Sequence, residues 1–193
     1  MLSEKLKENT KTAHIELEKL LVQKIKSIQA IDDYLEILAY FYRFFAPLEK
    51  AIFPQLEEGF PDAAQRRKAE WILEDIHSFK PAYQPVFTSS YTPEVTSLSQ
   101  AIGALYVLEG STLGGQVICK MVAQKLDLSQ AEGFKFFSGY GEETLPMWDN
   151  FKKYINNRSW NTEEENVVID AANRTFGLFK QMIDHTGVSC SWT

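Results

Sequence analysis

Cysteine is scarce in this chain. Cys119 and Cys190 are the only two among 193 residues, and neither belongs to a CxxC or zinc-type spacing. Thiols this few and this far apart in sequence are typical of a reducing compartment, so we expect free thiols. The fold must then be held by packing alone, for which 45% hydrophobic and 13% aromatic residues provide the material.

An excess of positive charge and long apolar runs are also missing. The formal net charge of −6 argues against a nucleic-acid-binding protein, which needs a basic surface. No apolar run approaches the ~20 residues of a membrane span, and the polar N-terminus does not resemble a signal peptide. We therefore expect a cytoplasmic protein that binds neither nucleic acid nor membrane.

The alternating patterns of β-strands are absent too, whereas apolar residues recur at helical spacing along most of the chain. We expect an all-α fold in a single domain spanning residues 1–193, with an ordered helical core over about 2–186 and a short C-terminal tail. Helices are predicted over about residues 3–27, 32–54, 61–79, 94–126, 145–157 and 162–187, with N-caps at Ser3, at Asp32 or Asp33, and at Thr162. A proline-broken loop over 81–93 and an ordered loop over 131–143 are expected to connect them.

Four glycines lie inside one predicted helix, where glycine is unfavourable. The predicted helix over 101–125 contains four glycines, each costing roughly 1 kcal/mol relative to alanine in a helix interior. Gly103, Gly110 and Gly114 share one helical face. Such a strip favours either a close helix–helix crossing or a wall against which a flat ligand lies. The glycines alone do not decide between the two.

Only three histidines occur, and no HxxxH or HExxH pair is present. His14 lies at the border of the first helix's apolar face, with Lys7 and Lys11 on the same flank. An imidazole beside two ammonium groups suits haem, with iron on the histidine and propionates on the lysines. The alternative is a hydrogen-bonded boundary histidine with two solvated lysines. A haem on His14 would need a wall without side chains opposite it, and the glycine helix could supply that wall.

Two segments together resemble the haem oxygenase family, in particular its shorter bacterial members. KENTKTAH is similar to the family's proximal-helix motif, which ends in the iron ligand, and LEGSTLGGQVI is similar to the distal-helix signature that lies over the haem. The resemblance extends over nearly the whole chain. It implies that His14 binds iron and that Lys7 and Lys11 help to hold the propionates.

The same resemblance implies further haem contacts on other helices. On the distal helix these would be Tyr106, Gly110, Gly114 and Gly115. WDNFKKYIN resembles the helix that sends a basic residue to the second propionate, which makes Lys152 or Lys153 the candidate. ANRTFGLFKQM resembles the last helix, where an aromatic residue touches the haem, and Phe176 is the residue expected to do so.

One position departs from the family pattern. Animal-type members carry an aspartate after the glycine that matches Gly110, whereas this chain has Ser111. A hydroxyl can relay protons through water but cannot accept charge as a carboxylate does. Gly110, Ser111 and Gly114 are the expected catalytic positions, with Tyr106 and Glu109 as possible contributors.

The resemblance implies an enzyme that opens haem to biliverdin and releases carbon monoxide and ferrous iron. Haem is then both cofactor and substrate. The chain contains no flavin or nucleotide fingerprint, so dioxygen is expected to be reduced with electrons from a separate donor such as a ferredoxin or a flavoprotein reductase. Two alternatives stay open: a haem- or bilin-binding protein with little turnover, and a protein of the same architecture that acts on another molecule or mediates contacts without haem.

Overall fold

The computed structural model describes residues 1–66, 68–84, 93–128 and 133–185. Within these ranges the chain forms α-helices and short 3-10 turns and no strand, which confirms the predicted all-α class. The elements are α1 (Leu2–Ser27), α2 (Ile31–Ile52), η1 (Phe53–Gln55), α3 (Glu70–Phe79), α4 (Leu98–Leu126), α5 (Lys135–Ser138), η2 (Gly141–Glu143), α6 (Thr144–Asn157) and α7 (Thr162–His185).

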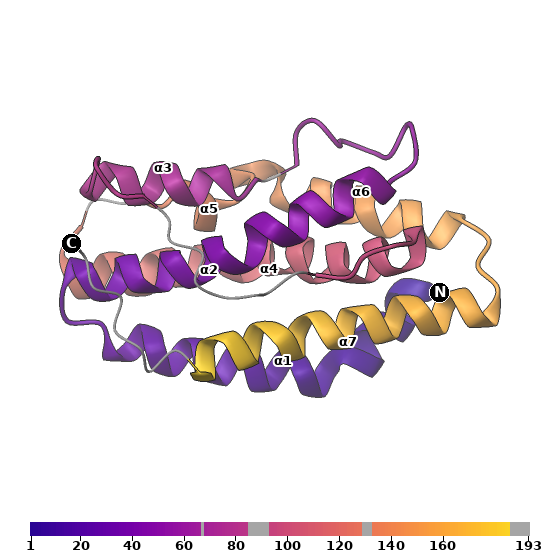
Figure 1. Cartoon of the computed structure of the whole chain (residues 1–193), viewed down its shortest axis with the longest axis horizontal. Helices are drawn as coiled ribbons and strands as arrows, with labels where there is room; N and C mark the ends of the chain where they lie inside the picture. The colour runs from indigo at the N-terminus through magenta and orange to yellow at the C-terminus, as the bar shows by residue number, and fades with distance from the viewer. Residues whose placement is uncertain (67, 85–92, 129–132, 186–193) are drawn as a thin grey trace.

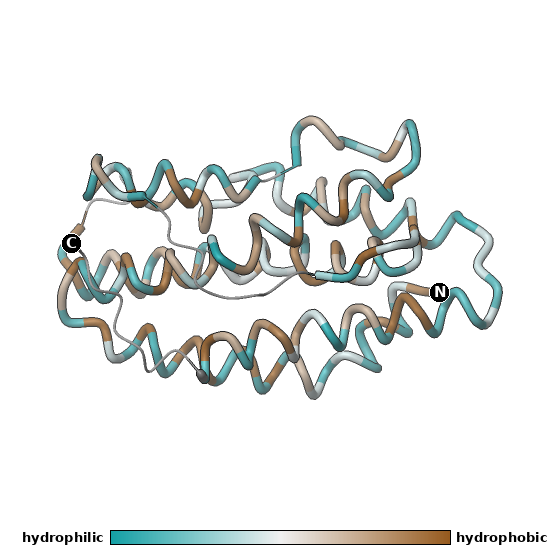
Figure 2. Tube along the Cα trace, in the orientation of Figure 1, coloured by the Kyte–Doolittle hydropathy of each residue, from teal (hydrophilic) through white to brown (hydrophobic). Residues whose placement is uncertain are grey.

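The helices pack around α4. In Figure 1, α1 and α7 lie side by side along one long edge of the molecule, and α3 and α5 lie on the opposite side. α4 contacts α1, α2, α5, α6 and α7, so it forms the centre of the bundle. Polar and apolar stretches alternate along the outer helices, as expected for helices buried on one side (Figure 2). Where α2, α5 and α7 meet, the core is a cluster of phenylalanine rings: Phe41, Phe44, Phe45, Phe136, Phe137 and Phe179.

Helix α4 is apolar over most of its length because it is enclosed. Among the described residues it alone has the length and composition to cross a membrane, and 56% of its most apolar window is buried inside the fold. The sequence analysis found no apolar run of membrane-spanning length, and α4 exceeds that expectation. The core helix of a soluble protein can have the same length and apolar composition. The N-cap of α4 is Ser97, whose hydroxyl accepts the Gln100 N–H.

The other helix starts differ from the predicted caps by a few residues. α1 begins after Met1, not Ser3, and the Ser3 N–H donates to the Asn156 side chain. The N-cap of α2 is Ala30, and Asp33 accepts its backbone N–H from within the first turn. α7 begins after Asn161, which forms a reciprocal capping pair with Glu164. The predicted N-cap at Thr162 is thus displaced by one residue.

The third helix begins nine residues later than predicted. Pro61 was expected to open it, but Asp62 adopts a positive φ of 57° and starts a tight turn instead. The side chain of Asp62 accepts a hydrogen bond from Asn150 of α6 at 3.0 Å. The turn ends at Arg66, which is buried. Long-range contacts therefore override the local helical pattern here.

Several predictions lie wholly or partly outside the described residues. These are most of the loop over 81–93, the start of the segment over 131–143, and the tail after residue 185 with Cys190. The described part of the second segment contains the short helix α5 and is more regular than the loop expected there.

Helix α5 is tied to α3 by a buried carboxylate. Asp75 accepts the backbone N–H groups of Lys135 and Phe136 at 2.7 and 2.8 Å. Burial raises the pKa of Asp75 to about 6, against the lowering effect of these hydrogen bonds. α5 in turn packs under the second half of α4, so Asp75 supports the central helix indirectly.

We expect the Asp75 carboxyl to give the fold a measurable pH dependence. Because its folded-state pKa lies above the unfolded value of 3.8, the native state binds the proton more tightly, and stability falls as pH rises from about 4 to about 6. Asp75→Asn removes this pH-dependent part of the stability and one of the two oxygens that accept backbone hydrogen bonds. Urea denaturation should show the largest deficit of the variant near pH 4 and a smaller one above pH 6. A deficit that grows with pH would contradict this expectation.

Candidate functional site

Helices α1 and α4 run parallel, and two contacts set their register. Near the N-terminal end, the Thr10 side chain lies close enough to the Tyr106 hydroxyl to offset part of the rise that burial causes in its pKa. Near the other end, the Lys125 ammonium donates to the Ile28 carbonyl oxygen at 3.4 Å. Four residues after the Thr10–Tyr106 contact come His14 on α1 and Gly110 on α4. The two residues therefore lie at the same level on neighbouring helices.

The imidazole of His14 lies at the surface between α1 and α7. Its ring is exposed and meets the buried Phe176 ring edge-on, with centroids 5.6 Å apart and an interplanar angle of 77°. Phe176 thus fixes one side of the ring and leaves the nitrogens accessible. The structure brings these two predicted residues together although they are far apart in sequence.

The four glycines of α4 divide into two pairs. A Cβ on Gly103 would lie 2.2 Å from the Val168 carbonyl oxygen, and one on Gly115 would lie 2.1 Å from that of Phe137. These two glycines allow close packing against α7 and α5. Gly115 therefore has a packing role, and its expected contact with haem stays a prediction.

Gly110 and Gly114 face open space instead. A Cβ on Gly110 would meet only Trp148, at an ordinary 3.8 Å, and one on Gly114 would meet nothing within 4 Å. No packing requirement among the described residues explains their lack of a side chain. They form a bare strip of backbone at the level of His14, where a flat ligand could lie against α4.

Tyr106 closes one end of this strip. It is half-buried between α1 and α6, and its ring lies 5.4 Å from that of Trp148. Burial raises the pKa of Tyr106, and the nearby Thr10 side chain partly offsets this effect. The phenol therefore stays protonated near neutral pH and can donate to an anionic group.

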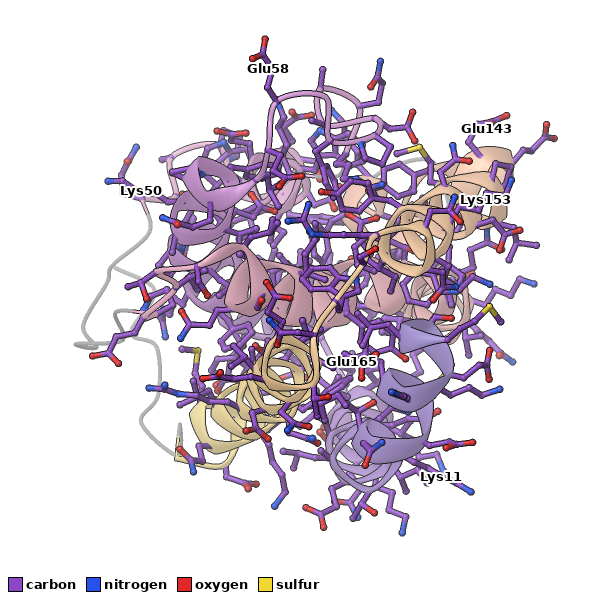
Figure 3. All side chains as sticks on the ribbon, turned by 90° about the vertical axis from the view of Figure 1, so that its right-hand side faces the viewer. Lys11, Lys50, Glu58, Glu143, Lys153 and Glu165 are labelled. Atoms are coloured by element: carbon purple, nitrogen blue, oxygen red, sulfur yellow. The ribbon has the colours of Figure 1, made fainter. Side chains whose placement is uncertain are left out.

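The predicted lysines lie around the same end of the strip. Lys7 and Lys11 are exposed on α1, one to two turns before His14. Figure 3 shows Lys11 on α1 and Lys153 on α6 at the outer surface on the same side of the molecule. Lys152 pairs with Asp149 at 2.8 Å and lies 5.9 Å from the centre of the Trp148 ring. Water screens such an exposed pair and makes it weak, so Lys152 can exchange partners.

Ser111 is directed at its own helix. Its hydroxyl donates to the Leu108 carbonyl oxygen at 2.6 Å, and Thr112 bonds to the Glu109 carbonyl oxygen in the same way. A serine hydroxyl that donates in this way can also accept a hydrogen bond. The Ser111 proton, however, is already used within α4.

Glu109 is buried and does not reach solvent. One of its oxygens lies 2.7 Å from Nη1 of Arg66, and the Tyr140 hydroxyl donates to the carboxylate at 3.0 Å. This contact was missed from the sequence, because Arg66 opens the run RRK, which is typical of a charged surface. Trp148 was missed as well. No local pattern distinguishes it from an ordinary core aromatic residue.

Two cavities lined by described residues lie elsewhere and do not involve the predicted site residues. One, of about 250 Å³, lies between α2, α4 and α7 near Gln100 and Arg174. The other, of about 500 Å³, lies beside α2 near Tyr42 and Lys68. Within the described ranges, no group of three or more histidine, cysteine or acidic residues could hold a metal ion.

Comparison with known proteins identifies relatives of this arrangement. The family model for heme oxygenase matches residues 1–185. The chain is 26% identical to the heme oxygenase PigA of Pseudomonas aeruginosa over 185 residues, which cover 95% of this chain and 92% of that protein.

Solved structures show the same fold. The NO- and CO-bound heme oxygenase of Neisseria meningitidis superposes with a TM-score of 0.82 at 22% identity, covering 99% of this chain and 94% of that one. Heme oxygenase-1 of the cyanobacterium Synechocystis, in complex with heme, gives a TM-score of 0.74 at 15% identity, covering 95% and 90%.

Proposed function

Because this chain belongs to the haem oxygenase family, an enzyme family that degrades haem, we propose that it opens haem to biliverdin with release of carbon monoxide and ferrous iron. One observation carries the proposal. The exposed imidazole of His14 and the bare backbone at Gly110 and Gly114 lie at one level on two parallel helices. A flat macrocycle with a metal at its centre fits between a ligand and a wall of this kind.

The residues fit haem in three respects. His14 would hold the iron through a ring nitrogen, and the porphyrin would bring metal ligands of its own. Gly110 and Gly114 leave the distal side uncovered by side chains. Lys7 and Lys11, with the Tyr106 hydroxyl beside them, place donors at one end, where the propionates would lie.

Bound haem would supply the redox chemistry with dioxygen, and the protein's share is ligation, orientation and control of water. His14 would bind iron as a neutral imidazole, with the Phe176 edge limiting its rotation. Gly110 and Gly114 would leave room beside the bound group, because neither carries a side chain. Ordered water near Ser111 would deliver protons, with the Ser111 oxygen as an acceptor.

Electrons would come from a separate protein, such as a ferredoxin or a flavoprotein reductase. The exposed lysines Lys7, Lys11 and Lys153 near the site could contact acidic groups of such a donor. The proposed electron donor matters only if the protein binds haem, so haem binding is tested first.

Hemin titration tests the proposal directly. We expect a histidine-type Soret band on the wild type and its conversion to a bilin spectrum when ascorbate or a reductase system is added in air. His14→Ala should lose the histidine-type band because the axial nitrogen is gone. His77→Ala is the matched control, because its ring bonds the Tyr83 carbonyl oxygen away from the site. Wild type without a histidine-type band, or His14→Ala with an unchanged ferric spectrum, would refute the assignment.

A haem- or bilin-binding protein with little turnover is the second candidate. The orientation of Ser111 favours it, since the hydroxyl proton is bonded within α4 and no carboxylate stands at this position. A Soret band that persists in air with reductant, without a bilin spectrum, would support this alternative over the enzyme.

A further inference from the structure

We infer that Arg66, Glu109 and Tyr140 are positioning residues that hold the Gly110 segment of α4 at a fixed distance from His14. This inference rests on the proposed function, since that distance sets the width of the haem site. None of the three residues lies in the site itself. They act through the backbone of α4.

The segment of α4 around Gly110 is built to bend. Gly110 weakens the helix, and the hydroxyls of the next two residues, Ser111 and Thr112, bond back to carbonyl oxygens three residues earlier, at 2.6 Å each. Back-bonding hydroxyls of this kind favour bends in helices. Without outside support, this part of α4 would be its most pliable.

Outside support reaches α4 at the residue immediately before Gly110. Glu109 is 4% exposed and Arg66 is 1% exposed, and their ion pair measures 2.7 Å. Tyr140, in the link between α5 and η2, donates to the same carboxylate. Two separate parts of the chain therefore converge on one side chain of α4.

The arginine is itself firmly held. Its Nε donates to the Pro61 carbonyl oxygen at 3.2 Å, and its guanidinium lies between the rings of Phe60 and Phe151, with centroids 5.0 and 5.6 Å away. Phe151 stacks on Trp148, whose ring edge faces Gly110. A continuous packed path thus connects the buried ion pair to the bare strip.

A pair placed only for stability would act on the whole fold, whereas a positioning pair acts on one segment. Tyr140→Phe separates the two because it removes one hydrogen bond and keeps the ring. Tyr154→Phe is the matched control: its hydroxyl also donates to a glutamate, Glu57, at 3.1 Å, but this pair lies at the surface and does not involve α4.

Hydrogen exchange of the haem-free protein is the first readout. For Tyr140→Phe we expect roughly tenfold faster exchange confined to amides around residues 108–114. Tyr154→Phe should leave that segment unchanged. Unaltered exchange in Tyr140→Phe, or acceleration spread evenly over all helices, would overturn the inference.

The second readout uses hemin. Tyr140→Phe should change the ratio of bilin isomers or the yield of bilin per electron consumed, with hemin affinity kept within about twofold, because the ligand contacts remain. A pattern identical to that of the wild type would count against the inference. If wild-type protein fails to convert hemin, the proposed function fails, and the exchange experiment still decides whether α4 is held as described.

Discussion

Glu109→Ala is expected to lower the free energy of unfolding by about 3–5 kcal/mol. Removal of the carboxylate leaves the Arg66 guanidinium buried without its counter-charge. Nη2 of Arg66 already lacks a hydrogen-bond partner within the described part of the chain, so no spare acceptor is at hand. Urea or guanidinium denaturation followed by far-UV circular dichroism measures the loss.

Two further variants make this result interpretable. Glu57→Ala removes a carboxylate from an exposed pair with Arg158 and should cost about 1 kcal/mol or less. Replacing both buried partners with apolar residues, Arg66→Met with Glu109→Leu, should recover most of the stability, because the desolvation penalty disappears with the charges. If Glu109→Ala costs no more than Glu57→Ala, the pair is not the buried interaction described above.

The sequence predicts most helices because their signals are local. Apolar periodicity and turn residues place α1, α2, α4, α6 and α7 to within a few residues of their observed bounds. The N-cap residues are harder to predict than the helices themselves. Asn161 and Thr162 are both good N-cap residues, and only the folded structure selects Asn161. Local patterns therefore locate a helix better than they locate its ends.

The start of α3 and the burial of Arg66 could not be predicted in the same way. Both depend on contacts with residues far along the chain: Asp62 with Asn150, and Arg66 with Glu109. An arginine in the run RRK is ordinarily solvated, and nothing within a few residues indicates a buried acidic partner. Such information exists only once the helices are packed.

The candidate site was partly predictable, because its residues do leave signals in the sequence. His14 and the glycines of α4 are each weak signals, but together they form a pattern that a flat ligand would require. The structure adds that Gly103 and Gly115 serve packing and that Gly110 and Gly114 do not. Close packing thus explains Gly103 and Gly115, and the ligand wall stays a prediction for Gly110 and Gly114.

A matched pair of alanine substitutions tests this division, because Gly114 and Gly115 are neighbours in the same helix. Gly115→Ala is expected to lose about 3 kcal/mol, since the new methyl group would overlap the backbone of Phe137 and force α4 and α5 apart. Gly114→Ala should gain up to about 1 kcal/mol, because alanine is the better helix former and its methyl group points into open space. Thermal or urea denaturation of the haem-free proteins compares the two.

Opposite signs at adjacent positions cannot arise from helix propensity alone, which predicts a gain at both. Equal gains would show that α5 yields easily to a methyl group, and a loss at Gly114 would show that its open side is filled. Gly114→Leu extends the test to function, because a larger side chain occupies the space that we assign to haem. It should retain the helical content of the wild type and weaken hemin binding. Unchanged hemin binding by this variant would mean that the bare strip of α4 is not the wall of the haem site.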